Sequence, residues 1–309
     1  MKIKYGDQLQ INEIDGEEID LFLFANNIEE RKCCAYDKIK KTNKIIKTIS
    51  LYYHNSNIED IEGVSNLVIK NHIQIINLLD EELAKCQKEK IIIYIDYSCM
   101  TKSWYYTIIL FLSNRNLRQE NIDAYFSYTP SIFSIPLEPK PNTDISPLPG
   151  KYIIPNNKPK ALIVGLGYEE NKAQGIIDQL DPALTYLFYT DPALDPKFVE
   201  AVEKNNSTIL SEFYGNTIKF PSNDLLYLEK ELSKIYFLLK DKYSIIIAPL
   251  GTKPFAYIAM MMSVIFSDIE IWRVGSGEDI NPYPRIPFEE EQFIISKVIF
   301  QADDDKVKS

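Results

Sequence analysis

The sequence has few of the residues on which metal-dependent and hydrolytic active sites are most often built. Only two histidines, His54 and His72, occur among its 309 residues, and neither stands in an HExxH or another metal-ligand spacing. A GxSxG segment is absent, which leaves an α/β-hydrolase nucleophile elbow without support. The sequence therefore predicts no metal site and no cofactor.

The cysteines lack a pattern as well. Cys33, Cys34, Cys86 and Cys99 include no CxxC spacing and no arrangement that suits zinc or a disulfide framework. The acidic, polar first segment has no apolar signal-peptide core, and no apolar run approaches the roughly 18 residues of a membrane span. We therefore expect reduced thiols in a cytoplasmic protein that does not enter a membrane.

Positive charge is scarce relative to negative charge. The chain has 34 Lys and Arg against 44 Asp and Glu, a formal net charge of −10. Because neutralising phosphates requires a cationic surface, this balance argues against non-specific nucleic-acid binding. Apolar residues make up 45% and charged residues 25% of the chain, the balance of a globular protein with a large core.

Apolar segments alternate with polar or amphipathic ones along both halves. Short continuous apolar runs are typical of strands covered on both faces, as in a parallel sheet. In the first half we predict strands at 19–25, 45–53, 90–97 and 122–128 and helices at 65–88 and 102–117. In the second half we predict strands at 160–167, 184–189, 243–249 and 269–274 and helices at 169–180, 195–205, 222–240 and 255–266. With right-handed crossovers, this order predicts an α/β fold of two Rossmann-like three-layer domains, each with a mostly parallel sheet.

A proline-rich stretch separates the two halves. Eight prolines lie from Pro130 to Pro159, where they remove backbone donors and block helices. We therefore predict a first domain at 1–129, a linker at 130–158 and a second domain at 159–309. The alternative is a long proline-rich excursion packed on the surface of one domain.

The sharpest local signal for a ligand site is Gly251-Thr252-Lys253-Pro254, which follows a predicted strand. Ligands of open parallel sheets bind beyond the carboxyl ends of the strands. A glycine, a hydroxyl, an ammonium and a helix-starting proline would place backbone N–H groups and positive charge together there, which favours phosphate. Because GxxxxGK[ST] is absent, hydrolysis of a nucleoside triphosphate is not implied. The alternative is an ordinary strand-to-helix turn with a solvated Lys253.

Other strand ends of the second half supply further candidates. The candidate ligand-binding residues of this half are Gly165, Gly167, Tyr168, Asp191, Gly251, Thr252, Lys253, Arg273 and Ser276. Glu170 stands where a dinucleotide fingerprint needs its third glycine, and with Glu169 it would repel a pyrophosphate. The alternative is a tight turn into a helix whose first turn favours acidic residues.

A second candidate site follows the predicted strand 90–97. It consists of Asp96, Ser98, Thr101 and Lys102, whose carboxylate, hydroxyls and ammonium could hold ribose and phosphate. The same region could act catalytically, with Asp96 or Glu29 activating water or a sugar carbon and Arg31 or Lys102 stabilising charge. The structural alternatives are that Asp96 or Thr101 caps the next helix, and that Glu29 and Arg31 are solvated on a surface helix.

A strand followed by Gly251-Thr252-Lys253 and a helix, in a Rossmann-like domain, resembles the CARF and SAVED-type sensor domains of prokaryotic immunity. The resemblance covers about residues 150–280, and its specific part is that tripeptide. It implies recognition of cyclic or linear oligonucleotide second messengers, often at a dimer interface, with Thr252 and Lys253 lining the site. The sequence departs from the family in that no recognisable nuclease or other effector domain is attached.

We therefore predict a sensor or regulatory protein that binds a nucleotide or oligonucleotide second messenger, as in antiviral defence, with a second copy of the chain or an effector subunit as partner. In this prediction Lys253 and the N–H groups near Gly251 hold phosphate, Arg273 pairs with a second phosphate, and Tyr168 stacks on a base. One alternative is a metal-independent enzyme of the N-glycosidase or transferase type that acts on a nucleoside or nucleotide. The other is a scaffold subunit without a ligand.

Overall fold

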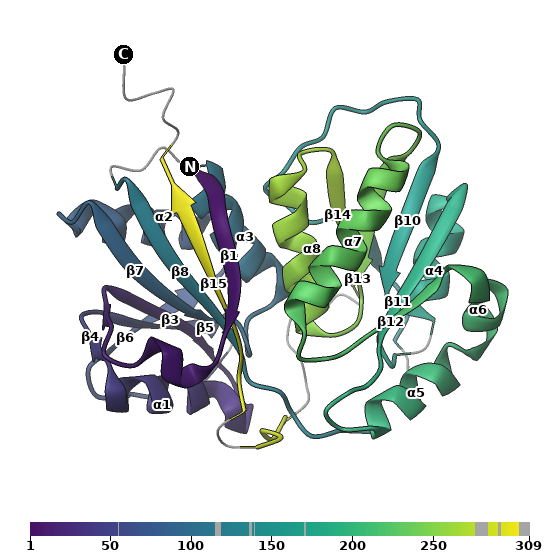
Figure 1. Cartoon of the computed structure of the whole chain (residues 1–309). Helices are drawn as coiled ribbons and strands as arrows, with labels where there is room; N and C mark the ends of the chain where they lie inside the picture. Colours follow the sequence, from purple (N-terminus) through teal and green to yellow (C-terminus); the bar gives the residue numbers. More distant parts are fainter. Residues whose placement is uncertain are drawn as a thin grey trace, which may run out of the picture. The chain divides into compact units, whose positions relative to one another are not determined.

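The computed structural model describes residues 1–54, 56–114, 119–135, 138, 140–169, 171–275, 284–289 and 292–302. The chain divides into two compact units. Unit 1 comprises Met1–Ile132 and Pro282–Ser309, and unit 2 comprises Phe133–Asn281. Each unit contains a sheet with helices packed on it (Figure 1). Among the described residues, no helix has the length and apolar content needed to cross a membrane.

Unit 1 is built on a seven-stranded sheet with the order β1-β15-β8-β7-β3-β5-β6. Its strands are β1 (Lys2–Leu9), β3 (Leu21–Asn26), β5 (Thr48–Tyr53), β6 (Val64–Ile69), β7 (Lys90–Asp96), β8 (Asn121–Tyr128) and β15 (Ile294–Gln301). The strands from β8 to β6 are parallel to one another. In contrast, β15 runs antiparallel to β8, and β1 runs antiparallel to β15. A separate parallel pair joins β2 (Glu18–Ile19) and β4 (Lys44–Ile45).

Aromatic side chains fill much of the core of unit 1. Its helices are η1 (Ile11–Ile14), η2 (Glu30–Cys33), α1 (Cys34–Thr42), α2 (Ile73–Lys85) and α3 (Lys102–Asn114). The rings of Phe22 and Tyr94, on neighbouring strands, stack with centroids 4.7 Å apart, and Phe24 stacks on Tyr36 of α1 at 5.6 Å. The continuous apolar run of β3 is therefore buried on both faces, as its sequence predicts.

The predicted helix at 65–88 is wrong in its first part, because residues 64–69 form β6 and α2 begins at Ile73. The spacing of Leu67 and Ile69 suits a strand as well as a helix. At the start of α2, the Asn71 side chain accepts the N–H of Ile73 at 3.1 Å and the Gln74 side chain accepts the N–H of Lys70 at 2.6 Å. These bonds satisfy backbone donors that a continuous helix would use internally, so the helix starts at Ile73.

Unit 2 is built on a six-stranded sheet with the order β12-β11-β10-β13-β14-β9. Its strands are β9 (Asp144–Pro147), β10 (Lys160–Gly165), β11 (Leu184–Thr190), β12 (Thr217–Phe220), β13 (Ser244–Pro249) and β14 (Ile269–Gly275). Its helices are α4 (Lys172–Leu180), α5 (Lys197–Asn205), α6 (Ser207–Glu212), η3 (Tyr214–Asn216), α7 (Leu225–Leu239) and α8 (Lys253–Ile265). The strands from β12 to β14 are parallel, and β9 runs antiparallel to β14.

The parallel parts of the two sheets share one strand order. Numbered along the chain, the parallel strands of each sheet lie in the order 3-2-1-4-5, with an antiparallel strand beside the fifth. This is the order of doubly wound sheets, in which the chain reverses direction across the sheet after the third strand. The predicted α/β class with mostly parallel sheets is confirmed, and the similarity of the two halves lies in this order.

Two segments lie outside the parts to which the sequence assigned them. β15 lies in the first sheet, between β1 and β8, although its residues were predicted to belong to a second domain at 159–309. β9 lies inside the predicted linker 130–158 and pairs with β14 at the edge of the second sheet. An edge strand tolerates Pro147 because one side of it forms no ladder bonds. Part of the proline-rich stretch is therefore packed on unit 2.

Lys151 fastens this stretch to unit 2. Its Nζ donates hydrogen bonds to the carbonyl of Ser263 near the end of α8, at 2.5 Å, and to that of Ile269 at 2.8 Å. Desolvation by burial lowers the pKa of Lys151 to about 8, although the charges of Asp268 and Glu270 oppose the shift. A neutral amine has two N–H donors, so both carbonyls stay satisfied after the proton is lost.

This shift predicts a pH dependence of stability. The ordinary pKa of lysine is 10.5, so between about pH 8 and 10.5 the unfolded chain binds a proton at Lys151 that the folded chain does not. We therefore expect the Lys151 contribution to the free energy of unfolding to rise with pH across this range. Urea denaturation of the wild type and Lys151→Met, repeated across the range, should show the wild type gaining relative to the variant. A difference that stays constant with pH would contradict the assignment.

Candidate functional site

Each sheet has a point at which the chain changes direction across it, and loops diverge there. In unit 2 this switch point lies between β10 and β13, and in unit 1 it lies between β3 and β7. Ligands of open α/β sheets bind beyond the carboxyl ends of the strands at such points. The loops that follow these four strands contain most of the residues predicted from the sequence.

The two loops at the unit 2 switch point touch backbone to backbone. A Cβ added at Gly251 would lie 2.2 Å from the carbonyl oxygen of Leu166, and one added at Gly167 would lie 2.9 Å from that of Leu250. A Cβ at Gly165 would lie 2.4 Å from the ring of Phe255 in α8. The three glycines are therefore required for the close approach of these loops and of α8. The structure brings the predicted Gly165, Gly167 and Gly251 together.

Two asparagines hold the other side of the loop after β10. Asn205 Nδ2 donates to the carbonyl of Tyr168 at 2.6 Å, and Asn206 Nδ2 donates to that of Gly167 at 2.9 Å. Because the C=O and N–H of a trans peptide point in opposite directions, the N–H groups of Tyr168 and Glu169 point away from these asparagines. Neither asparagine was predicted to contact the site; two consecutive asparagines at the end of a predicted helix were the available signal.

Helix α8 begins at the Lys253 of the predicted motif, with Thr252 as the residue before it. Its first turn contains no acidic residue, and within the part of the chain that the structure describes no side chain caps it. The hydroxyl oxygen of Thr252 is buried and has no hydrogen-bond partner among the described residues. The positive end of the helix dipole and an unsatisfied hydroxyl therefore lie together at this loop, an arrangement that suits an anion.

Tyr168 belongs to a cluster of three aromatic rings at the same edge. Its ring centroid lies 6.1 Å from that of Phe133 and 5.7 Å from that of Phe198 in α5, and the latter two lie 5.2 Å apart. All three residues are partly exposed. The cluster offers an apolar, aromatic surface beside the glycine loop, which suits the flat face of a base.

Glu169 does not present an uncompensated charge to this loop. Its carboxylate forms an ion pair with Lys172 in the first turn of α4. The repulsion of a phosphate that the sequence predicts for Glu169 is therefore reduced. Glu170 lies outside the described residues.

Asp191 and Arg273 lie in ion pairs within the protein. Asp191 Oδ2 accepts a hydrogen bond from Lys219 Nζ at 2.8 Å. Arg273, on β14, pairs with Asp144 on β9, whose pKa is lowered by the hydroxyl of Ser146 and by the Arg273 charge. Both side chains therefore have structural contacts at the sheet edges, and a ligand role for them stays a prediction. Ser276 lies outside the described residues.

The corresponding edge of unit 1 contains a hydrogen-bonded turn centred on Asp96. Asp96 Oδ1 accepts the N–H of Ser98 at 2.9 Å and its hydroxyl at 2.5 Å, and Ser98 Oγ accepts the N–H of Thr129 at 2.7 Å. Asp96 is buried and bonds to Ser98 in the loop before α3, and Thr101 is the residue directly before this helix, so the alternative that Asp96 or Thr101 caps the helix stays a prediction. Thr101 and Lys102 lie at the start of α3, where Thr101 Oγ1 is 3.0 Å from Ser103 Oγ.

Glu29 and Arg31 are buried, so the predicted alternative that they are solvated is wrong. Arg31 Nε contacts Glu29 Oε2 at 2.6 Å, while its two terminal nitrogens donate to the carbonyls of Thr129 at 2.6 Å and Ser98 at 3.0 Å. The guanidinium also lies 5.2 Å from the centre of the Tyr128 ring. Desolvation by burial lowers the pKa of Arg31, but the neighbouring Tyr128 and Glu29 raise it by more. The net shift is upward, so the side chain stays charged. Arg31 therefore ties together the segments that follow β3, β7 and β8.

Exposure distinguishes the two switch points. Residues 97–100, after β7 of unit 1, are buried, whereas residues 250–253, after β13 of unit 2, are partly exposed. The side chains of Asp96, Glu29 and Arg31 are buried and hydrogen-bonded inside unit 1. Buried hydroxyls without a partner among the described residues occur at both edges, for example Thr129 in unit 1 and Thr252 in unit 2, so exposure is the feature that differs. Unit 2 is the better candidate for ligand binding.

Comparisons with known proteins assign the chain to no family. The sequence matches no protein-family model, and no curated protein matches it. Among the described residues, no group of three or more His, Cys, Asp or Glu is placed to hold a metal ion. The assignment of a site therefore rests on the geometry of unit 2.

Proposed function

We propose that the protein is a nucleotide-binding sensor or regulatory protein whose ligand binds at the unit 2 switch point. The N-terminus of α8 and Lys253 hold the phosphate, and the Tyr168 cluster receives the base. A nucleotide or oligonucleotide second messenger, as the CARF and SAVED resemblance implies, has both the phosphate and the base that these two parts of the site would bind.

The observation that supports the proposal most is the start of α8. The helix has no side-chain cap and no acidic residue in its first turn, within the residues that the structure describes, and a buried Thr252 hydroxyl without a partner lies beside it. Helix N-termini bind phosphate through their N–H groups and their dipole. The close contact made by Gly251 places the loop after β10 against this helix start.

The enzyme alternative draws less support from the structure. Of its candidate groups in unit 1, Glu29, Arg31 and Asp96 are buried, with Arg31 bonded to Glu29 and Asp96 bonded to Ser98. A general base needs access to the proton that it removes. We therefore assign the carboxylates of unit 1 to the fold and not to catalysis.

Loss of the Lys253 ammonium should weaken phosphate binding. We expect Lys253→Ala to raise the Kd for the best-binding nucleoside phosphate by about tenfold or more, because a hydrogen bond to a charged group contributes about 1.5–3 kcal/mol. A thermal-shift panel of nucleotides identifies the probe, and calorimetric titration measures its Kd.

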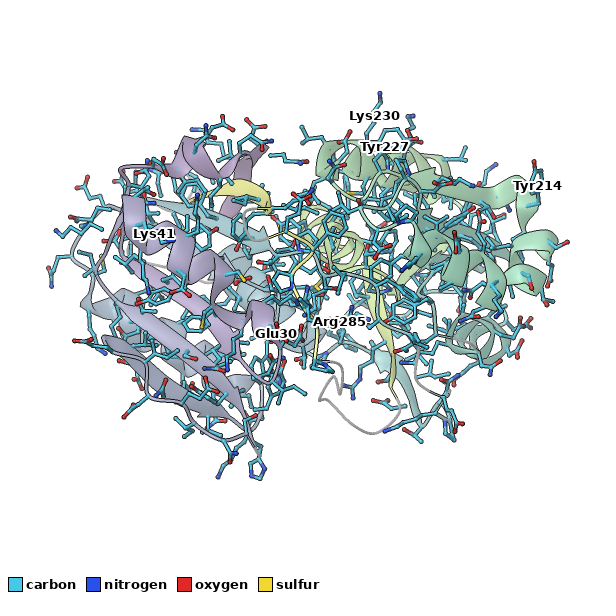
Figure 2. All side chains as sticks on the ribbon, turned by 90° about the horizontal axis from the view of Figure 1, so that it is seen from below. Glu30, Lys41, Tyr214, Tyr227, Lys230 and Arg285 are labelled. Atoms are coloured by element: carbon cyan, nitrogen blue, oxygen red, sulfur yellow. The ribbon has the colours of Figure 1, made fainter. Side chains whose placement is uncertain are left out.

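Lys230→Ala provides the matched control, because it removes the same charge from the outer side of α7. Figure 2 shows Lys230 and Tyr227 projecting away from the body of unit 2. This control should bind as the wild type does. Equal weakening in both variants would mean that only net charge matters, and an absence of any nucleotide shift in the wild type would overturn the proposed function.

A further inference from the structure

Thr190 is a buried polar residue at the same edge of the unit 2 sheet, and it has no role in the site proposed above. It is the last residue of β11, it pairs with Phe220 of β12, and only 7% of its surface is exposed. Its hydroxyl oxygen is buried and has no hydrogen-bond partner among the residues that the structure describes. A buried hydroxyl without a partner destabilises the folded state, so its presence calls for an explanation.

The strand register places Thr190 on the α8 side of the sheet. Residues two apart in a strand share a face, so Thr190 lies on the face of Phe188. The Phe188 ring centroid is 5.6 Å from that of Phe255, in the first turn of α8, and Phe255 also packs on Gly165 of β10. Thr190 is therefore one step nearer than Phe188 to the carboxyl edge, on the face that the first turn of α8 covers.

Two unsatisfied hydroxyls thus lie at one edge and on one side of the sheet. The second is that of Thr252, directly before α8. They come from chain segments 62 positions apart (252 − 190), in different strand-to-helix connections. A single ligand whose oxygen atoms accept a hydrogen bond from each hydroxyl would explain why both lack a partner.

We propose that Thr190 is a ligand-binding residue whose hydroxyl donates a hydrogen bond to a phosphoryl oxygen of the nucleotide. The proposal rests on the proposed function of the α8 site and adds a contact from the neighbouring strand β11. Phosphoryl oxygens are charged acceptors, which form shorter and stronger hydrogen bonds than neutral ones do. Its place at a predicted strand end was the one signal for this residue in the sequence, because the missing partner is visible only in the structure.

The test is the isosteric change Thr190→Val, with Thr190→Ser as the variant that keeps the hydroxyl. We expect Thr190→Val without ligand to be at least as stable as the wild type in thermal denaturation, because it removes an unsatisfied polar group. Its Kd for the nucleoside 5′-monophosphate with the largest wild-type thermal shift should rise by about tenfold, whereas its Kd for the corresponding nucleoside should not change. Thr190→Ser should bind as the wild type does.

Thr217→Val is the matched control, because Thr217 Oγ1 donates to the carbonyl of Phe213 at 2.9 Å in the same unit. It should lower the melting temperature and leave nucleotide affinity unchanged. If Thr190→Val lowers stability and keeps full affinity, or weakens nucleoside and nucleotide equally, the phosphate contact is overturned while the proposed function stands. If the wild type binds no nucleotide at all, the proposed function itself fails, and the Thr190 assignment fails with it.

Discussion

Replacing Arg31 with methionine should destabilise unit 1 by about 3–5 kcal/mol, which is a large part of the stability of a domain. The change removes a buried guanidinium that bonds Glu29 and the carbonyls of Ser98 and Thr129. The Glu29 carboxylate would be left buried and without its cationic partner, and the loops after β7 and β8 would lose their common donor. Burying an unpaired charge is among the largest effects that a single substitution produces.

The measurement is urea denaturation followed by the fluorescence of Trp104, which lies in α3 of unit 1. The other tryptophan, Trp272, lies in β14 of unit 2, so a Trp272→Phe background isolates the signal of unit 1. Lys44→Met removes an ion pair with Glu18 whose lysine is 70% exposed, and it should change stability by less than about 1 kcal/mol. Similar losses for the Arg31 and Lys44 variants would contradict the structural role of Arg31.

A double variant distinguishes a buried ion pair from two independent residues. The double variant Glu29→Gln/Arg31→Met should lose less free energy of unfolding than the sum of the losses of the two single variants. Each single variant leaves one buried charge without its partner, whereas the double variant contains neither charge. Additive losses would show that the carboxylate and the guanidinium do not depend on each other.

Replacing Gly251 with alanine should destabilise unit 2 by about 1–3 kcal/mol and weaken nucleotide binding by about tenfold or more. The new methyl group would lie 2.2 Å from the carbonyl oxygen of Leu166, and a backbone atom cannot move aside as the end of a side chain can. The two loops of the switch point would therefore separate, and the start of α8 would shift away from the loop after β10.

Gly215→Ala is the control for this change, because a Cβ there would meet no atom within 4 Å. It should leave stability within about 0.5 kcal/mol of the wild type and leave affinity unchanged. Thermal denaturation and calorimetric titration of both variants measure the two effects. A Gly251→Ala protein as stable and as active in binding as the wild type would show that the loops are not in close contact.

The parts of the fold that the sequence predicts are those in which local pattern and tertiary environment agree. β3, β7, β10 and β13 are short apolar runs, and each is a buried parallel strand as expected. β6 and β12 escaped prediction because their residues are partly exposed and mixed in character. The pairing of β1 with β15 joins the two ends of the chain, and no local pattern indicates such a partner.

The candidate site shows the same division. The rule that ligands bind at strand ends was enough to select Gly165, Gly167 and Gly251, which the structure brings together. The burial of Arg31 was not predictable, because its partners include Thr129, which is 98 residues away along the chain. The hydroxyls of Thr190 and Thr252 could not be recognised as unsatisfied before their surroundings were known.

The most direct test of the account is a titration of amide ¹H–¹⁵N spectra with the nucleoside 5′-monophosphate that stabilises the protein most. Binding at the unit 2 switch point predicts that the largest shifts fall on Gly167, Glu169, Gly251 and Thr252, with the amides of Asp96 and Ser98 unaffected. Shifts confined to the loops of unit 1, or no shift at saturating nucleotide, would contradict it.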